Sequence, residues 1–177
     1  MSRGKSSPAQ ITSAALRLFG EHGVHGTSLQ MIADELGVSK AAVYYHFRSK
    51  HDIVVAVLKP AMDGLANLVA AARECADQQC RVETVVEGLA DGAIAHREVY
   101  SVVLRDVAAL SVVSAPGDLL GELHSHLLGD SEDPVRQMKV AMFLSGLVAP
   151  AVDQNVSRMA DGEMRDAIVA VGMELAG

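Results

Sequence analysis

The stretch that decides the fold is residues 27–50, which read TSLQMIADELGVSKAAVYYHFRSK. Apolar residues in its first half recur at helical spacing, and Gly37 follows them where a helix often ends in a left-handed residue. Ser39 can cap a second short helix that turns Val43 and Phe47 inward. Two short helices joined around Gly37 predict a helix-turn-helix, a motif whose second helix lies in the major groove of DNA.

Helical periodicity continues upstream of this motif. Ser7 is placed to cap a helix whose first residue is Pro8, and Gln10 completes a capping box. An apolar stripe at helical spacing follows, and Gly23 is expected to end this helix. The next helix, the first of the motif, is expected to begin at Thr27.

Helices are also predicted through the rest of the chain. Ser49, with Asp52 three residues later, opens a long helix that runs to about Ala76. Pro60 lies inside it and should kink or break it, because proline lacks the N–H group. Further helices are expected at about 82–96, 98–113, 117–129, 134–153 and 161–176. No segment alternates with a period of two residues, so the predicted fold class is all-α.

Charge divides the chain into two parts. Residues 1–59 hold seven Lys and Arg against four Asp and Glu, a net charge of +3, whereas the remainder carries −10. Four of the six aromatic residues also lie in the first part. The predicted organisation is a basic three-helix head over residues 1–52, with 1–7 as a flexible arm, and an acidic helical body over 53–177.

The sequence argues against export, membrane insertion and catalysis. Its longest uncharged apolar run, residues 140–152, is too short to span about 30 Å of hydrocarbon, and charges interrupt the N-terminal apolar stretch. It contains no Walker loop, no dinucleotide-binding glycine motif and no zinc-protease motif. We therefore expect a cytoplasmic protein that is not an enzyme and that uses no cofactor and no metal.

The most specific pattern in the chain is Gly-Val-Ser-x-x-x-Val-Tyr-x-His-Phe-x-x-Lys, from Gly37 to Lys50. In this pattern the sequence resembles the TetR family of bacterial transcriptional repressors, and the resemblance is close over residues 7–59. It implies a ligand-responsive repressor whose homodimer binds a palindromic DNA operator through its two recognition helices. Beyond residue 59 only the length and the helical content match.

The resemblance also implies which residues of the motif touch DNA. Phosphate contacts are implied for Thr27, Ser28, Tyr45, His46 and Lys50. Contacts within the groove are implied for Ser39, Lys40, Ala41 and Tyr44. Ala41 offers only a methyl group, so Lys40 is the main prediction for a guanine contact. The alternative is that Tyr44 and Phe47 are core residues and that His46 caps or packs. Arg48 and Lys50 would then form only a solvated face.

A repressor of this kind needs two heads about 34–36 Å apart, so its body must form a dimer. The last two predicted helices carry apolar stripes with small residues that allow close approach, and the resemblance implies a four-helix bundle between two copies. The predicted interface residues are Met138, Met142, Ser145, Ala149, Met164, Ile168, Val171, Gly172 and Leu175. The alternative is that these two helices form the core of the monomer.

The resemblance further implies a small-molecule pocket among the middle helices. Large or polar-tipped side chains in otherwise Ala- and Val-rich helices are its predicted lining: Met62, Leu65, Leu89, Tyr100, Leu104 and Phe143. Because this set carries no charge, we expect a small apolar effector. The alternative is that each of these residues belongs to the ordinary core. Pro60 is the candidate hinge between head and body.

Other signals point less strongly to a function. Cys75 and Cys80 are expected to be free and inert, and a thiol switch is the alternative. His124 and His126 are not accompanied by the further Cys, His or carboxylate residues that a metal site needs. Three other functions compete with the ligand-responsive repressor: a DNA-targeted enzyme such as a recombinase, a redox- or metal-sensing regulator, and a helical protein-interaction module that does not bind DNA.

Overall fold

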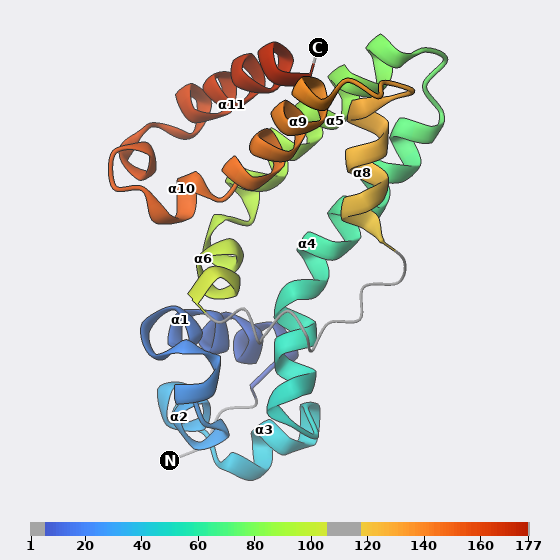
Figure 1. Cartoon of the computed structure of the whole chain (residues 1–177). Helices are drawn as coiled ribbons and strands as arrows, with labels where there is room; N and C mark the ends of the chain where they lie inside the picture. The colour runs from blue at the N-terminus through green and yellow to red at the C-terminus, as the bar shows by residue number, and fades with distance from the viewer. Residues whose placement is uncertain (1–5, 106–117, 177) are drawn as a thin grey trace. The chain divides into compact units, whose positions relative to one another are not determined.

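A computed structural model describes residues 6–105 and 118–176, and every regular element in these ranges is a helix (Figure 1). The predicted all-α fold class is confirmed. The described residues form two compact units, 6–60 with 98–105 and 61–97 with 118–176. The predicted boundary at residue 52 falls inside the long helix α4 (Lys50–Arg73), and it stays a prediction.

The first unit contains α1 (Pro8–Gly26), α2 (Leu29–Glu35), α3 (Lys40–His46) and the first part of α4. Each of these helices contributes apolar side chains at helical spacing to one core. Its fully buried members include Ile11, Phe19, Ile32, Val43 and Ile53. Burial of these side chains fixes α2 and α3 against each other as a helix-turn-helix, since such short helices are not stable alone.

The terminal residues of α1 act as predicted. Ser7 Oγ accepts a hydrogen bond from the Gln10 N–H at 3.3 Å, and Gln10 Oε1 accepts one from the Ser7 N–H at 2.8 Å. At the other end, Gly23 has a φ of +72°, a left-handed conformation that interrupts the helical geometry before Gly26. Regular helix therefore stops at the predicted glycine.

The two helices of the motif each begin after a serine cap. Ser39 accepts from the backbone of α3 as predicted. In α2 the capping residue is Ser28, whose hydroxyl accepts from the Met31 N–H at 3.1 Å, so the helix begins at Leu29. The predicted start at Thr27 was wrong, because the Thr27 hydroxyl bonds to backbone carbonyls of α1 and does not cap α2.

Helix α4 opens with a capping box and continues through a proline. The Ser49 N–H donates to Asp52 Oδ2, and the Asp52 N–H donates to Ser49 Oγ, each at 3.1 Å. The helix is continuous through Pro60, so Pro60 does not break it, and a kink there stays a prediction. By length and composition α4 is able to cross a membrane, but Ile53 and Val57 on its apolar side are buried inside the protein.

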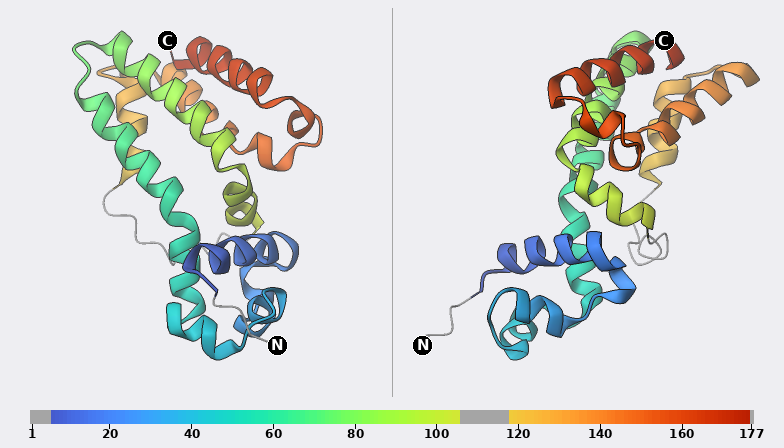
Figure 2. Two further views of the ribbon diagram at one scale, coloured as in Figure 1. Left: turned by 180° about the vertical axis from the view of Figure 1, so that it is seen from behind. Right: turned by 90° about the vertical axis from the view of Figure 1, so that its left-hand side faces the viewer.

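The second unit contains α5 (Gln78–Ala95), α8 (Leu119–Leu128), α9 (Pro134–Gly146), α10 (Ala149–Val152), the 3-10 turn η1 (Val156–Arg158) and α11 (Asp161–Ala176). Helix α11 packs against α5 and α9 (Figure 2). Helix α8 also contacts α5 and α9. Side chains from α5, α8 and α9 form the centre of this unit, and they include Val82, Val85, Leu123, Leu127 and Val140.

Two predicted helices differ from those observed. The helix expected at 98–113 is α6 (Arg97–Arg105) as far as it is described, and its remainder lies outside the described residues. The helix expected at 134–153 is divided into α9 and α10. Pro150 explains the division, because its ring clashes with the carbonyl of the residue four positions back, Gly146, where α9 ends.

Candidate nucleic-acid interface

Helix α3 separates one buried side chain from an exposed aromatic face. Val43 is fully buried, whereas Tyr44 and Tyr45 are 47% and 85% exposed. The Lys40 ammonium lies 5.7 Å from the centroid of the Tyr44 ring, within the range of a cation–π contact, and Ala41 is exposed beside it. The alternative that Tyr44 is a core residue is wrong, and the face that α3 presents to solvent is aromatic and basic.

The end of α3 extends this surface. The Tyr45 and His46 rings meet edge to face, with centroids 5.0 Å apart and an interplanar angle of 85°. His46 is partly exposed, and so is Phe47, which was expected to point inward. Phenol and imidazole donors on such a face suit contacts to phosphate oxygens.

The two serine caps retain a hydrogen atom that can be donated. Ser39 Oγ accepts from the Ala42 N–H at 3.2 Å, and Ser28 Oγ accepts from the backbone of α2. A hydroxyl that accepts through a lone pair still has its O–H to donate. Both serines therefore position a motif helix and keep one donor for a phosphate or a base.

Thr27 is not an exposed donor. Its side chain is 1% exposed, and its hydroxyl lies 3.1 Å from the Leu18 carbonyl oxygen and 2.8 Å from that of Gly23. The predicted phosphate contact of this hydroxyl is therefore corrected. The single O–H of Thr27 is directed at these two carbonyl oxygens, and it fixes the turn from α1 to α2.

Lys50 also bonds within the protein. Its ammonium donates to the carbonyl oxygens of Val24, His25 and Thr27 at 2.7, 3.3 and 2.9 Å. An ammonium has three hydrogen atoms, so these acceptors occupy all of its donors. Lys50, at the start of α4, thus holds the turn that orients α2, and its phosphate contact stays a prediction.

Sequence reasoning missed a second link in this unit. Arg17 Nη2 donates to Glu35 Oε1 at 2.9 Å and joins α1 to the end of α2. No short-range pattern identifies this pair, because its members are eighteen residues apart. The helix-turn-helix is thus also held by a contact between α1 and α2 that does not involve α3.

The predicted dimer residues fall into two groups. Met138 and Met142 on α9 are each 61% exposed and Val171 on α11 is 49% exposed, although all three are apolar. Two others face the core of their own unit, which corrects their assignment. Met164 is 1% exposed, and a Cβ on Gly172 would lie 2.6 Å from a methyl group of Val86 and 2.7 Å from the Phe143 ring.

An apolar groove lies between α9, α10 and α11. It has a volume of about 230 Å³ and is lined by Met142, Phe143, Gly146, Leu147, Ala149, Pro150, Val156, Ile168, Val171 and Leu175. Ile168 and Leu175 also pack against the core, and Ser145 is exposed on α9. Five of the predicted interface residues thus line one groove.

The predicted effector residues do not share one environment. Leu89 and Phe143 are buried in the core of the second unit, Leu65 packs against that core, and Met62 is partly buried. Burial raises the pKa of the Tyr100 hydroxyl above its usual value. The side chain of Leu104 lies outside the described residues.

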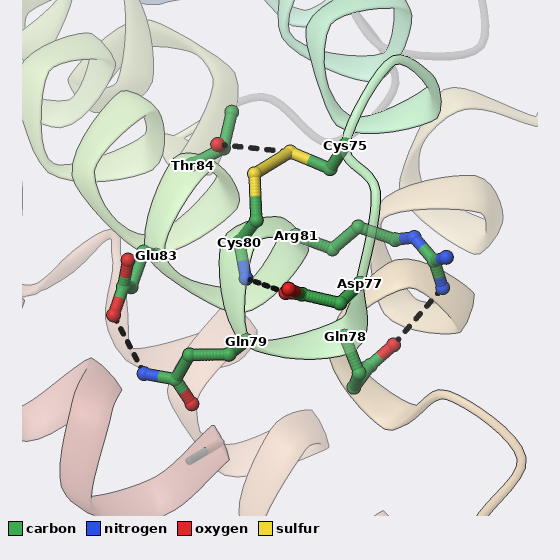
Figure 3. The surroundings of a disulfide bond; sticks show 8 residues. All are labelled: Cys75, Asp77, Gln78, Gln79, Cys80, Arg81, Glu83 and Thr84. Atoms are coloured by element: carbon green, nitrogen blue, oxygen red, sulfur yellow. Dashed lines mark hydrogen bonds between the residues drawn. A yellow bond between two sulfur atoms is a disulfide. The ribbon is translucent and has the colours of Figure 1, made fainter.

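Cys75 and Cys80 are joined by a disulfide (Figure 3), so the expectation that they are free was wrong. Cys75 follows the end of α4, and Cys80 lies in the first turn of α5. Their Cα atoms are 5.6 Å apart, which is within the range that a disulfide requires. The turn between the two helices brings the two side chains together.

Comparison with known proteins places this geometry in a family. The family described as "Bacterial regulatory proteins, tetR family" matches residues 11–57. The chain is 30% identical over 149 residues to the HTH-type transcriptional activator FasR of Mycolicibacterium smegmatis. This alignment covers 81% of this chain and 68% of FasR. It is 40% identical over 60 residues to IcaR, a negative transcriptional regulator of a biofilm operon in Staphylococcus aureus, covering 34% of this chain and 32% of IcaR.

The fold has a solved counterpart in PfmR, a TetR-family transcriptional regulator from Thermus thermophilus. The two structures superpose with a TM-score of 0.71 over 93% of this chain and 97% of PfmR, at 24% sequence identity. The helix-turn-helix and its exposed α3 face define a DNA-binding transcriptional regulator, and these relatives are regulators rather than enzymes. The chain belongs to the tetR family of bacterial regulatory proteins.

Proposed function

We propose that the chain is a ligand-responsive repressor whose homodimer binds a palindromic operator in the bacterial cytoplasm. The observation that carries this proposal is the exposed face of α3. A helix that buries Val43 and exposes Lys40, Tyr44 and Tyr45 has its apolar side in a core and its hydrogen-bond donors in solvent. A surface of this kind suits the phosphates and base edges of the major groove.

The groove between α9 and α11 supports the dimer. Its lining is almost wholly apolar, and Met138 and Met142 add exposed apolar surface on α9. Large exposed methionines on a body with a net charge of −10 beyond residue 59 are the kind of patch that a partner surface covers. We propose a second copy as that partner, because a two-fold symmetric operator requires two heads.

The proposed effector is a small apolar molecule that binds the second unit. Leu89 and Phe143 are apolar and buried, so a ligand that reached them would have to separate core side chains. Such a ligand favours one arrangement of the body over another and acts on DNA binding by its difference in affinity for the two. Calorimetric binding only of polyanionic or strongly cationic molecules would contradict an apolar effector.

Repression is proposed for the wild-type dimer without effector, as for a negative regulator such as IcaR. The relative FasR is an activator, so the choice between repression and activation is tested separately from DNA binding. A reporter gene placed behind the selected operator should be less active when the chain is expressed. Higher reporter activity would contradict repression and leave the DNA-binding proposal intact.

The test of DNA binding is a titration of labelled duplexes, selected from a random pool, with the full chain at several salt concentrations. We expect specific binding that weakens as salt rises, and weaker binding to all duplexes by Tyr45→Ala. Leu120→Ala is the matched control, because Leu120 is 62% exposed on α8 in the other unit. Equal binding by all three proteins, or no binding to any duplex, would contradict the proposal.

A further inference from the structure

The disulfide closes the turn between α4 and α5 (Figure 3). Both of its cysteines are partly exposed. We propose that Cys75 and Cys80 form a reversible redox pair, a site of thiol–disulfide exchange, and that its state sets the affinity for DNA. The second half of this proposal rests on the function proposed above.

The turn is held by contacts that do not depend on the bridge. Asp77 Oδ1 accepts from the Cys80 N–H at 2.8 Å and caps α5. The Gln78 amide donates to the carbonyl oxygens of His126 and Leu127 at 2.8 and 3.3 Å, at the end of α8. These contacts hold the first turn of α5, and with it Cys80, after the bridge opens, so Cys75 can form the same bond again.

A purely structural bridge explains this position poorly. The chain between the two cysteines is short, and short loops gain the least stability from cross-linking. The helices on both sides already bury Ala72, Val82 and Val85 in the core of the unit. In a cytoplasmic protein, disulfides are chiefly transient and catalytic or redox-sensing.

A small dithiol opens the bridge by thiol–disulfide exchange. A thiolate of the dithiol bonds to Cys80 Sγ, and the electron pair of the broken S–S bond passes to Cys75 Sγ. The Thr84 hydroxyl, 3.3 Å from Cys75 Sγ, is placed to donate a hydrogen bond to the thiolate that leaves. The second thiol of the dithiol then attacks the dithiol sulfur that is bonded to Cys80 Sγ, and Cys80 leaves as a thiolate. The dithiol is oxidised to a cyclic disulfide, and its two protons pass to the cysteines.

Helix α4 connects this pair with the DNA-binding motif along the chain. It runs without interruption from Lys50, which holds the turn before α2, to Arg73, two residues before Cys75. The bridge ties the chain beyond the end of α4 to the first turn of α5. Opening it releases that tie, so the arrangement of α4 that binds DNA is less strongly favoured in the reduced protein.

The first measurement is a thiol titration of the full chain in mixtures of reduced and oxidised glutathione. The chain has two cysteines, so every thiol signal comes from this pair. We expect two free thiols per chain in the reduced protein and none in the oxidised protein, with complete and reversible conversion between the two. Non-reducing gels should show a monomeric band. A pair that stays oxidised in excess dithiothreitol, or that reoxidises only between chains, would overturn the proposal.

The second measurement compares the affinity of the oxidised and reduced wild-type protein for the same operator. We expect Kd to rise about fivefold on reduction, and we expect Cys75→Ser/Cys80→Ser to be insensitive to dithiothreitol. Equal Kd values for the two wild-type forms would overturn regulation by the pair. Loss of DNA binding in both forms would instead contradict the proposed function, and the thiol titration would still decide whether the pair is reversible.

Discussion

The two units expose unusual side chains for different reasons. The first exposes Tyr44 and Tyr45 within a segment of net charge +3, whereas the second exposes Met138, Met142 and Val171 within a segment of −10. Aromatic donors beside a lysine suit a polyanion, and methionine surface suits another apolar surface. The bulk charge of −7 therefore describes neither surface.

In both units polar side chains hold turns by bonding to backbone carbonyls, as Gln78 does in the second unit. In the first unit the Thr27 hydroxyl and the Lys50 ammonium bond to backbone carbonyls and hold the motif in place. Residues of one motif thus divide into those that we propose contact DNA and those that position the others.

The largest effect is expected from Met142→Asp in the groove of the second unit. Burying a carboxylate against the apolar surface of another copy is costly, so the dimer should dissociate. Loss of the second head should weaken operator binding about a hundredfold or more. Sedimentation and a DNA titration check both effects, with Leu120→Asp on α8 as the control. A Met142→Asp protein that remains dimeric and binds normally would show that the groove is not the interface.

The next effect is expected from Lys50→Met, which keeps the length of the side chain and removes its donors. Three carbonyl oxygens lose their partner, so the free energy of unfolding should fall by about 1–3 kcal/mol. Lys40→Met is the control, because Lys40 is exposed in the same unit and its ammonium only faces the Tyr44 ring. Equal losses in a urea titration of the two variants would remove the positioning role of Lys50.

Lys40→Ala should change which sequences are bound. A lysine that contacts a guanine contributes about 1–3 kcal/mol to the discrimination of that base pair. Titration of operator variants should therefore show relaxed preference at one position of each half-site, with Tyr45→Ala weakening all variants alike. A uniform loss by Lys40→Ala would instead identify Lys40 as a phosphate contact.

The smallest effect is expected from Thr27→Val. The variant keeps the shape of the buried side chain and removes its hydroxyl, so unfolding should require about 1 kcal/mol less. Thr12→Val is the control, since the Thr12 hydroxyl donates to the Ala9 carbonyl at the exposed surface of α1. The salt dependence of DNA binding should not change, and a flatter salt slope would restore Thr27 as a phosphate contact.

The sequence predicted those features that depend on neighbouring residues. The capping box of Ser7 and Gln10, and the caps of α3 and α4, are formed between residues three apart. Burial of Val43 follows from the spacing of apolar residues within one helix. These features need no knowledge of the rest of the chain.

Features that depend on distant residues were not predictable in this way. The carbonyl acceptors of Lys50 lie at least 23 residues away in the chain, and the Leu18 carbonyl near the Thr27 hydroxyl lies nine residues away. The sequence shows that Gly172 is small enough for another helix to approach closely. Only the packing shows that the neighbour is Phe143 of the same chain. The disulfide likewise depends on how the turn folds back.

The most direct measurement of the central claim is selection of duplexes from a random pool, followed by the stoichiometry of the complex. We expect an inverted repeat bound by two chains, with half-sites about one helical turn apart. Selection with Lys40→Ala should recover altered bases. A single half-site bound by one chain, or recovery of no common sequence, would contradict the central claim.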